Sequence, residues 1–235
     1  GTIEGAPSPG GYVMDSRPGL YRHVLVLDYK SLYPSIIRSF GIDPLGLILG
    51  LREQQVSPQE DPHLAPIPGF LGACFSRQDP ILPGLIASLR QERDKAKLQQ
   101  DDALSRAIKI LMNSFYGVLG SSGCRFFDPR LASSITLRGQ WIMLETRLLI
   151  EGAGFQVIYG DTDSTFVWLD REVTPEQAES IGRQLARQVT EHWQHHLQQE
   201  WGLDSCLELQ YERHYRRFLM PTIRGAEVGS KKRYA

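Results

Sequence analysis

Residues 155–168 read FQVIYGDTDSTFVW. Two short apolar runs, 155–158 and 165–168, flank six small, polar and turn-forming residues, and this pattern predicts a β-hairpin. The tip of the hairpin holds Asp161 and Asp163. Because residues two apart on an extended chain point the same way, one hairpin edge can present both carboxylates. The stretch therefore predicts a sheet whose hairpin tip carries acids.

A third acid stands at the end of another predicted strand. The apolar run at residues 23–27 predicts a buried strand that delivers Asp28, and a helical segment follows at residues 31–39. We expect this strand to lie beside the hairpin. Three converging carboxylates suit divalent metal ions that support phosphoryl transfer. Two alternatives stay open, since an Asp at a strand end can cap a helix and a lone D-x-D motif also serves glycosyltransferases.

The rest of the chain mixes helices with connections. Helical periodicity at residues 84–99 and 102–117 predicts an antiparallel helical hairpin. Further helices are expected at about 129–150 and 174–201, and two or three strands from residue 205 onward. Residues 1–19 and most of 41–83 are rich in Gly and Pro and predict irregular connection.

Composition bounds the protein class. The chain of 235 residues is 41% hydrophobic and 23% charged, enough to bury a core and too apolar for disorder. Its formal net charge is −1, yet basic residues gather near the end, at Arg213, Arg216, Arg217, Arg224, Lys231, Lys232 and Arg233. This cluster favours a phosphate-rich partner, although a solvated charged edge fits equally well.

Cysteine usage and hydropathy indicate a reducing, cytoplasmic setting. Cys74, Cys124 and Cys206 are far apart and lack the spacing of a structural zinc site or a disulfide framework. We find neither a stretch apolar enough for a membrane span nor a secretion signal, so no membrane partner is expected. The chain begins with Gly1 and stops within a basic segment, and we therefore expect a fragment of a longer protein.

Four motifs in a characteristic order resemble family B DNA polymerases. Residues 28–37, DYKSLYPSII, are similar to motif A, and YGDTDS at 159–164 is similar to motif C. Between them, KILMNSFYG at 109–117 resembles motif B, and KKRY at 231–234 resembles the family's primer-template contact. Residues 125–130 and 218–226 most resemble the bacterial members.

The resemblance implies an α/β (α+β) palm-and-fingers fold, in which an antiparallel palm sheet is backed by helices and a helical hairpin is inserted as fingers. Residues 1–75 would form a linker and the first part of the palm, residues 76–118 the fingers, and residues 119–235 the rest of the palm. The family's N-terminal, exonuclease and thumb domains are expected to be absent.

The resemblance also implies roles for individual residues. Asp28, Asp161 and Asp163 would be catalytic and would bind metal, together with the backbone carbonyl of Tyr29. Nucleotide binding would fall to Ser31, Leu32, Tyr33, Arg93, Lys97, Lys109, Asn113 and Tyr116. Tyr33 would exclude a ribose 2′-hydroxyl. DNA binding would fall to Gly10, Gly11, Tyr12, Gly117, Tyr159, Thr162, Lys231, Lys232, Arg233 and Tyr234.

The expected function is template-directed addition of deoxynucleotides to a primer 3′ end with two Mg²⁺ ions, for which Mn²⁺ could substitute. Its partners would be primer-template DNA and dNTPs, with a sliding clamp bound through regions outside these residues, in a bacterial, nucleoid-associated location. The main alternative is a non-catalytic nucleic-acid-binding fragment; a metal-dependent nuclease would not need the 109–116 helix face.

Two groups of residues are left out of the expected site. His192, His195 and His196 lack the glutamate and third ligand of a metal site and are assigned to a solvated helix face. Glu208 and Glu212 could approach the metals or could be surface acids.

Overall fold

The computed structural model describes residues 11–221, which fall into two compact units. We call residues 31–138 and 194–206 the helical unit. Residues 11–30, 139–193 and 207–221 form the sheet unit. The two longest helices, α5 (Pro129–Gly152) and α6 (Pro175–Trp201), contribute residues to both.

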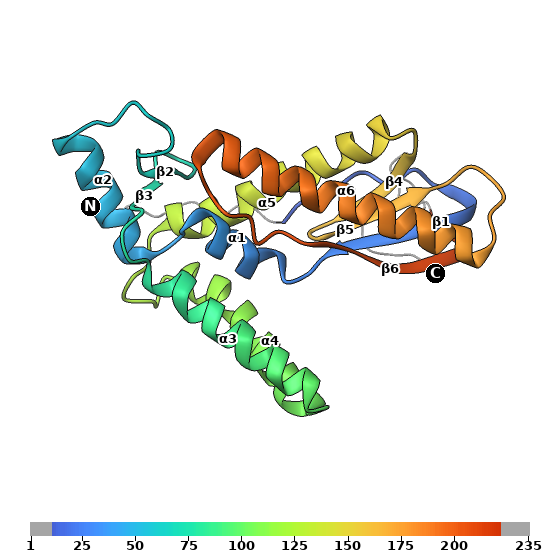
Figure 1. Cartoon of the computed structure of the whole chain (residues 1–235), viewed down its shortest axis with the longest axis horizontal. Coiled ribbons are helices and arrows are strands. Elements are labelled where there is room, and N and C mark those ends of the chain that lie inside the picture. The colour runs from blue at the N-terminus through green and yellow to red at the C-terminus, as the bar shows by residue number, and fades with distance from the viewer. Residues whose placement is uncertain (1–10, 222–235) are drawn as a thin grey trace. The chain divides into compact units, whose positions relative to one another are not determined.

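The sheet unit contains a four-stranded antiparallel sheet in the order β4-β5-β1-β6 (Figure 1). Its strands are β1 (Gly19–Tyr29), β4 (Gln156–Asp161), β5 (Ser164–Trp168) and β6 (Leu209–Met220). The strand that ends near Asp28 therefore lies directly beside the 156–168 hairpin. The predicted antiparallel sheet backed by helices is confirmed.

Both faces of β1 are covered, which explains why its sequence is apolar without alternation. On one face, Val24 and Val26 join a buried cluster with Phe166 and Phe218. The other face packs against α5 and α6, where Tyr29 is fully buried. The Tyr29 hydroxyl accepts from Trp193 Nε1 at 2.8 Å and lies 2.6 Å from the Thr146 hydroxyl.

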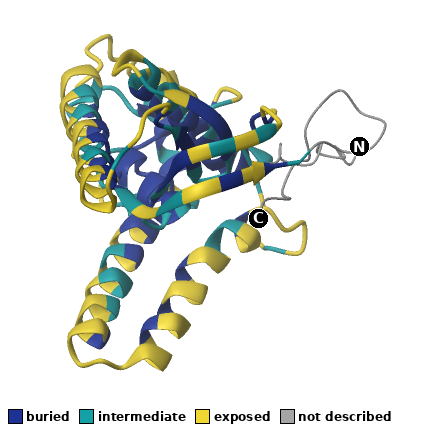
Figure 2. Cartoon of the chain, turned by 90° about the vertical axis from the view of Figure 1, so that its right-hand side faces the viewer, coloured by how far each residue is buried: buried dark blue, intermediate teal, exposed yellow. Residues whose placement is uncertain are grey.

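The helical unit begins with α1 (Leu32–Phe40) and α2 (Pro44–Val56) and a two-stranded ribbon of β2 (Ile67–Pro68) and β3 (Cys74–Phe75). The antiparallel hairpin of α3 (Ile81–Leu98) and α4 (Asp102–Leu119) follows, as predicted. Asp101 caps α4 by accepting a hydrogen bond from the Leu104 amide at 3.0 Å. Figure 2 shows that the hairpin helices are buried only in narrow stripes.

One expectation about secondary structure was wrong. Residues 44–56, predicted to be irregular, form α2, because Asp43 caps the helix through the Gly46 amide at 2.8 Å and Pro44 occupies its first turn. The glycines of α2 signalled close packing, since a Cβ on Gly50 would lie 2.5 Å from the Cys74 carbonyl oxygen. Of the two or three strands expected from residue 205 onward, the described residues hold one, β6, and residues 222–235 lie outside them.

A buried guanidinium holds several parts of the helical unit together. Arg138 in α5 lies 4.5 Å from the ring centroid of Phe40, 4.7 Å from that of Phe70 and 5.4 Å from that of Trp201. It also donates to the Pro68 carbonyl oxygen at 2.8 Å. Burial lowers its pKa to about 10, so the side chain stays charged at neutral pH.

Residues 32–56 are long and apolar enough, by composition, to cross a membrane. This segment is divided into α1 and α2 by Gly41, whose backbone is left-handed with φ of 61°. Within its most apolar 18-residue window, 67% of the residues are buried inside the protein. It has the character of core helices.

Candidate active site

The sheet brings the predicted acids to one of its ends. Asp28 on β1 lies opposite Ser164 on β5, and Asp161 on β4 lies opposite the same Ser164. Directly opposed residues of antiparallel strands point to the same face, and strands are about 4.8 Å apart, so these two acids flank β5. Asp163 lies in the two-residue link between β4 and β5. The three acids therefore lie at the same end of the sheet.

The hairpin tip has a constrained backbone. Thr162 adopts a left-handed conformation, with φ of 46°. Its hydroxyl donates to the Asp161 carboxylate at 3.0 Å, and the Tyr159 hydroxyl donates to the same carboxylate at 3.3 Å. Asp163 accepts a longer hydrogen bond, of 3.4 Å, from the Ser164 hydroxyl. Of the two acids, Asp161 is thus the more strongly held by neutral donors.

The segment before β1 lies against this tip. Met14 donates its amide to the Gly160 carbonyl at 2.8 Å, and Thr162 donates its amide to the carbonyl of Tyr12. Gly160 allows this close approach, because a Cβ at that position would lie 2.9 Å from the Tyr12 ring. Of the residues predicted to bind DNA, the structure thus brings Tyr12, Tyr159 and Thr162 together, with Gly11 next to Tyr12 in the chain.

The electrostatics of the acidic end suit a cation. Burial raises the pKa of the Asp163 carboxyl above its usual range, and the negative charges of Asp161 and Glu212 raise it further, whereas the Ser164 hydrogen bond lowers it. Sequence reasoning left Glu212 out. Glu212 forms a bulge in β6: Val26 of β1 pairs with Arg213 and Leu27 pairs with Tyr211, so Glu212 has no partner on β1. The clue to Glu212 was its place on β6, the strand that pairs with the Asp28 strand β1.

The donor chemistry of these acids fits Mg²⁺ or Mn²⁺, which prefer carboxylate oxygens. Within residues 11–221, however, no group of three or more His, Cys, Asp or Glu side chains is close enough to hold a metal as it stands. Side-chain rotation would be needed to bring Asp28, Asp161 and Asp163 onto one ion. The residues fit the metal in type, and the sheet brings their backbones to one end.

The helical unit holds the predicted nucleotide-binding residues. Ser31 precedes α1 in a left-handed conformation, with φ of 51°, and its buried hydroxyl has no hydrogen-bond partner. The first amides of a helix are also unpaired within the helix and attract anions. The start of α1 therefore offers donors at Ser31, Leu32 and Tyr33.

A second unpaired donor lies on α3. The buried Nε of Arg93 has no partner, and the pKa of Arg93 is lowered by burial and by the positive charge of Arg90. Two neighbouring basic residues, by contrast, pair with acids: Arg90 with Asp94 at 3.3 Å and Lys95 with Glu92 at 3.0 Å. The structure thus separates Arg93 from the surface charges that sequence alone could not distinguish from it.

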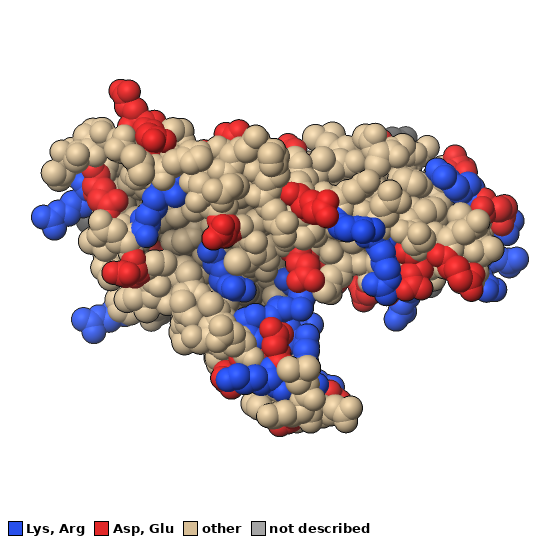
Figure 3. Space-filling model, in the orientation of Figure 1, with Lys and Arg blue, Asp and Glu red and all other residues tan. Residues whose placement is uncertain are grey.

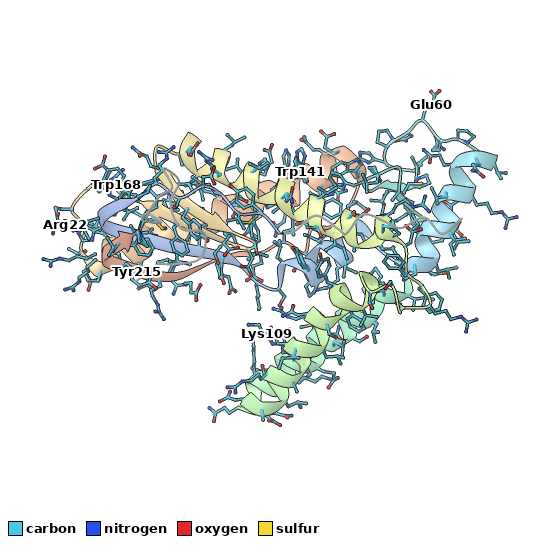
Figure 4. The ribbon with its side chains drawn as sticks, turned by 180° about the vertical axis from the view of Figure 1, so that it is seen from behind. Arg22, Glu60, Lys109, Trp141, Trp168 and Tyr215 are labelled. Atoms are coloured by element: carbon cyan, nitrogen blue, oxygen red, sulfur yellow. The ribbon has the colours of Figure 1, made fainter. Side chains whose placement is uncertain are left out.

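The remaining basic and polar candidates line the hairpin. Lys97 on α3 and both Lys109 and Asn113 on α4 are exposed. Lys and Arg side chains gather over the hairpin in Figure 3, and Figure 4 shows Lys109 projecting outward from α4. Gly117 is exposed on the same helix, and a Cβ there would meet nothing within 4 Å. Packing therefore does not explain this glycine.

Two tyrosines of the predicted nucleotide site are in contact. The rings of Tyr33 and Tyr116 have centroids 4.7 Å apart and an interplanar angle of 48°. The Tyr116 hydroxyl lies 3.0 Å from the Thr136 hydroxyl on α5. Sequence reasoning did not include Thr136, because nothing in the motifs marks it.

Several expected or notable features lie elsewhere. Gly10 and Lys231, Lys232, Arg233 and Tyr234 fall outside the described residues. The solvated face predicted for the histidines of α6 applies only to His195: the His192 ring contacts Trp193 and the His196 ring contacts Trp201.

An apolar pocket of about 460 Å³ in the helical unit contains none of the predicted site residues; it is lined by Asp43, Pro44, Leu45, Ile48, Ile81, Leu82, Leu85, Phe115, Val118, Leu119 and Phe126.

Comparison with known proteins agrees with these motifs. The sequence model of DNA polymerase family B matches residues 4–235. DNA polymerase II of Escherichia coli (strain K12) is 58% identical over the whole chain, which spans 29% of that protein. A DNA polymerase of Desulfurococcus sp. (strain Tok) is 33% identical over 96% of the chain and 27% of its own length.

A solved structure gives the same result. The family B DNA polymerase of Pyrobaculum calidifontis superimposes with a TM-score of 0.65 and 26% identity, over 100% of this chain and 28% of that one. The chain thus spans less than a third of the length of these relatives. The expected resemblance to the bacterial members of the family is supported by the Escherichia coli relative. The chain belongs to DNA polymerase family B.

Proposed function

We propose that these residues form the catalytic part of a template-directed DNA polymerase, which adds deoxynucleoside monophosphates to a primer 3′-hydroxyl and releases pyrophosphate. The main observation behind the proposal is that two buried hydrogen-bond donors in the helical unit have no partner. In residues 11–221 the buried side-chain atoms without a partner are Ser16 Oγ, Ser31 Oγ and Arg93 Nε. Two of the three belong to residues that resemble the family's triphosphate contacts.

Each unit would supply one half of the chemistry. In the helical unit, Ser31 and the first amides of α1 would bind the nucleotide phosphates with Arg93, Lys97 and Lys109. Asn113 would donate a further hydrogen bond, and Tyr33 and Tyr116 would contact the sugar and base. In the sheet unit, Asp28, Asp161, Asp163 and the Tyr29 carbonyl would hold two divalent ions. Only two residues separate Asp28 from Ser31 in the chain, which supports a shared role.

The reaction follows from these contacts. The primer 3′-hydroxyl gives its proton to solvent and its oxygen forms a bond to the α-phosphorus. The bond from that phosphorus to the oxygen bridging to the β-phosphorus breaks, and pyrophosphate leaves with the bonding electrons. When bound, two Mg²⁺ or Mn²⁺ ions would lower the pKa of the 3′-hydroxyl and neutralise the developing charge. The chain's own contribution is to orient the phosphates and exclude a 2′-hydroxyl. The bacterial relative suggests that this takes place on chromosomal DNA in the cytoplasm.

DNA contacts are proposed for the hairpin tip and its neighbours. Gly11, Tyr12, Gly117 and Thr162 would follow the template and primer backbone, whereas Tyr159, which is fully buried, would act by holding Asp161 through its hydroxyl. The basic residues Lys231, Lys232, Arg233 and Tyr234, with Gly10, would extend this contact, with affinity that falls as salt rises. Residues 76–118 would act as fingers and the segments on either side as palm.

The test is primer extension by two proteins. One is the chain of 235 residues; the other is a chimaera in which it replaces the matching 29% of its 58% identical bacterial relative. We expect the chimaera to extend a labelled primer with Mg²⁺ and dNTPs, and Asp28→Asn to stop extension without loss of DNA binding. A folded chimaera that binds primed DNA but never extends it would instead support the non-catalytic binding module.

A further inference from the structure

A chain of contacts joins Tyr33 to the interior of the helical unit. Tyr33 on α1 packs against Tyr116 on α4, with ring centroids 4.7 Å apart. The Tyr116 hydroxyl then lies 3.0 Å from Thr136 Oγ1 on α5. Thr136 Oγ1 in turn lies 2.9 Å from the Ala132 carbonyl oxygen. Three helices are thereby connected through side chains.

The hydrogen bonds of this chain have a defined direction. A threonine hydroxyl has one proton, and Thr136 donates it to the Ala132 carbonyl one helical turn earlier. Tyr116 must therefore be the donor in its bond to Thr136. Thr136 is completely buried, so water cannot take over as the partner of its oxygen.

This arrangement fixes the Tyr116 ring at both ends. Its Cα is held by the backbone of α4 and its hydroxyl by α5, while one side of the ring contacts Tyr33. A tyrosine held in this way cannot swing aside without breaking its bond to the buried oxygen of Thr136. Tyr33 therefore has a restrained neighbour on the side where Tyr116 packs.

We propose that Thr136 is a positioning residue that holds Tyr116 against Tyr33 and so sets how strongly the nucleotide site rejects a ribose 2′-hydroxyl. The inference rests on the proposed function, in which Tyr33 is the residue that meets the sugar. A 2′-hydroxyl needs room, and because Tyr116 packs against Tyr33, a movement of Tyr33 toward that side requires Tyr116 to move with it. The Thr136 hydrogen bond opposes that movement.

The test uses the chimaera and compares kcat/KM for a dNTP and for the matching ribonucleotide. Thr136→Val removes the hydroxyl and keeps the shape. We expect the ratio to fall about fivefold, the effect of losing one ordinary hydrogen bond, chiefly through a lower KM for the ribonucleotide. Thr136→Ser keeps the hydroxyl and should retain the ratio. Tyr116→Phe should reproduce the Thr136→Val effect, and the double variant should add no further loss.

A matched control lies on the same helix. Thr146 is also fully buried and makes the same pattern, with Tyr29 at 2.6 Å and the Ile142 carbonyl at 2.7 Å. Thr146→Val removes an equivalent hydrogen bond in the sheet unit, so it should lower the melting temperature and leave the ratio unchanged.

The inference is overturned if Thr136→Val folds and keeps the parental ratio, or if its effect and that of Tyr116→Phe are additive. If Thr136→Val does not fold, a parental ratio in Tyr116→Phe overturns it instead. A failure of the proposed function looks different: the parental chimaera does not extend, or Tyr33→Ala leaves the ratio unchanged.

Discussion

The main-chain amide of Tyr29 donates to the carbonyl oxygen of Asp163 across 2.9 Å. The residue that follows Asp28 is thereby fastened to the tip of the β4–β5 hairpin. Two acids that are 135 positions apart in the sequence (163 − 28) are thus carried by backbones that are hydrogen-bonded to each other. The sheet therefore fixes the backbone positions of these acids, and rotation of their side chains changes only where the carboxylates point.

Loss of one of these acids should stop catalysis and spare binding. Asp163→Asn in the chimaera should reduce kcat/KM for nucleotide addition on the order of a thousandfold, because metal ions supply several kcal/mol of transition-state stabilisation. Primer-template affinity should change less than about threefold. Steady-state extension and fluorescence anisotropy measure the two. Asp170→Asn, an exposed residue just after β5, is the control; equal losses in both variants would contradict the assignment.

The pKa of Asp163 predicts how metal-free stability depends on pH. Because this pKa is raised in the folded protein, ionisation of the carboxyl weakens the fold. This penalty is absent below the usual pKa of an aspartate and grows as pH rises through the interval up to the raised value. Asp163→Asn should therefore increase the melting temperature in EDTA at pH 7 and leave it unchanged near pH 3. Added Mg²⁺ should reduce the difference at pH 7; thermal unfolding at both pH values decides this.

Arg93 and Arg90 should differ in their effects on nucleotide use. Hydrogen bonds to charged groups contribute about 1.5–3 kcal/mol, so Arg93→Ala should raise the KM for dNTP about tenfold or more. Arg90 is already paired with Asp94, and Arg90→Ala should change the KM less than about threefold. Nucleotide titration of both variants provides the measurement. Similar KM values for the two would remove the argument from the unpaired Nε.

Gly117 should show a conflict between stability and function. Glycine in an exposed helix costs about 0.5–1 kcal/mol relative to alanine, and the space around Gly117 is open. Gly117→Ala should thus raise the free energy of unfolding by about that amount while weakening extension several-fold, because bound DNA would meet the new methyl group. Gly84→Ala, at a similarly open position on α3, should bring the stability gain alone. Unimpaired extension by Gly117→Ala would argue against DNA contact there.

The aromatic cage around Arg138 should stabilise the fold more with arginine than with lysine at this position. Arg138→Lys keeps the charge but cannot stack on three rings and reach the Pro68 carbonyl, so it should cost about 1–3 kcal/mol in the free energy of unfolding. Arg147→Lys, whose partner Glu151 is only partly buried, should cost less than about 0.5 kcal/mol. Urea unfolding of both variants tests this, and equal costs would mean that the cage does not stabilise the fold.

The sequence predicted the elements whose signal is local. The β4–β5 hairpin follows from two apolar runs around a turn-rich hexapeptide, and the α3–α4 hairpin from helical periodicity broken at Asp101. The missed helix α2 also has a local signal, the Asp43-Pro44 cap, but its glycines hid it. One of them, Gly50, reflects contact with Cys74, which is distant in sequence.

The parts of the site that sequence could not supply depend on tertiary contact. The resemblance assigned Arg93 to the nucleotide site, but its physical difference from Arg90 is tertiary: Arg90 is paired with an acid, whereas Arg93 has a buried atom without a partner. The influence of Glu212 on Asp163 requires the bulge in β6. Thr136 matters only because α5 passes the Tyr116 hydroxyl. None of these relationships has a periodicity or a motif.

The pairing of residues 12–17 with β4 also constrains how relatives can be recombined. Met14 bonds to Gly160 at 2.8 Å and Arg17 bonds to Ile158 at 3.1 Å, so this segment borders the acidic hairpin although it precedes β1 in the chain. A gene-shuffling crossover between residue 17 and β1 would combine residues 12–17 of one parent with the β4–β5 hairpin of another. Crossovers before Gly11 would inherit both together, and libraries built that way should retain more active clones.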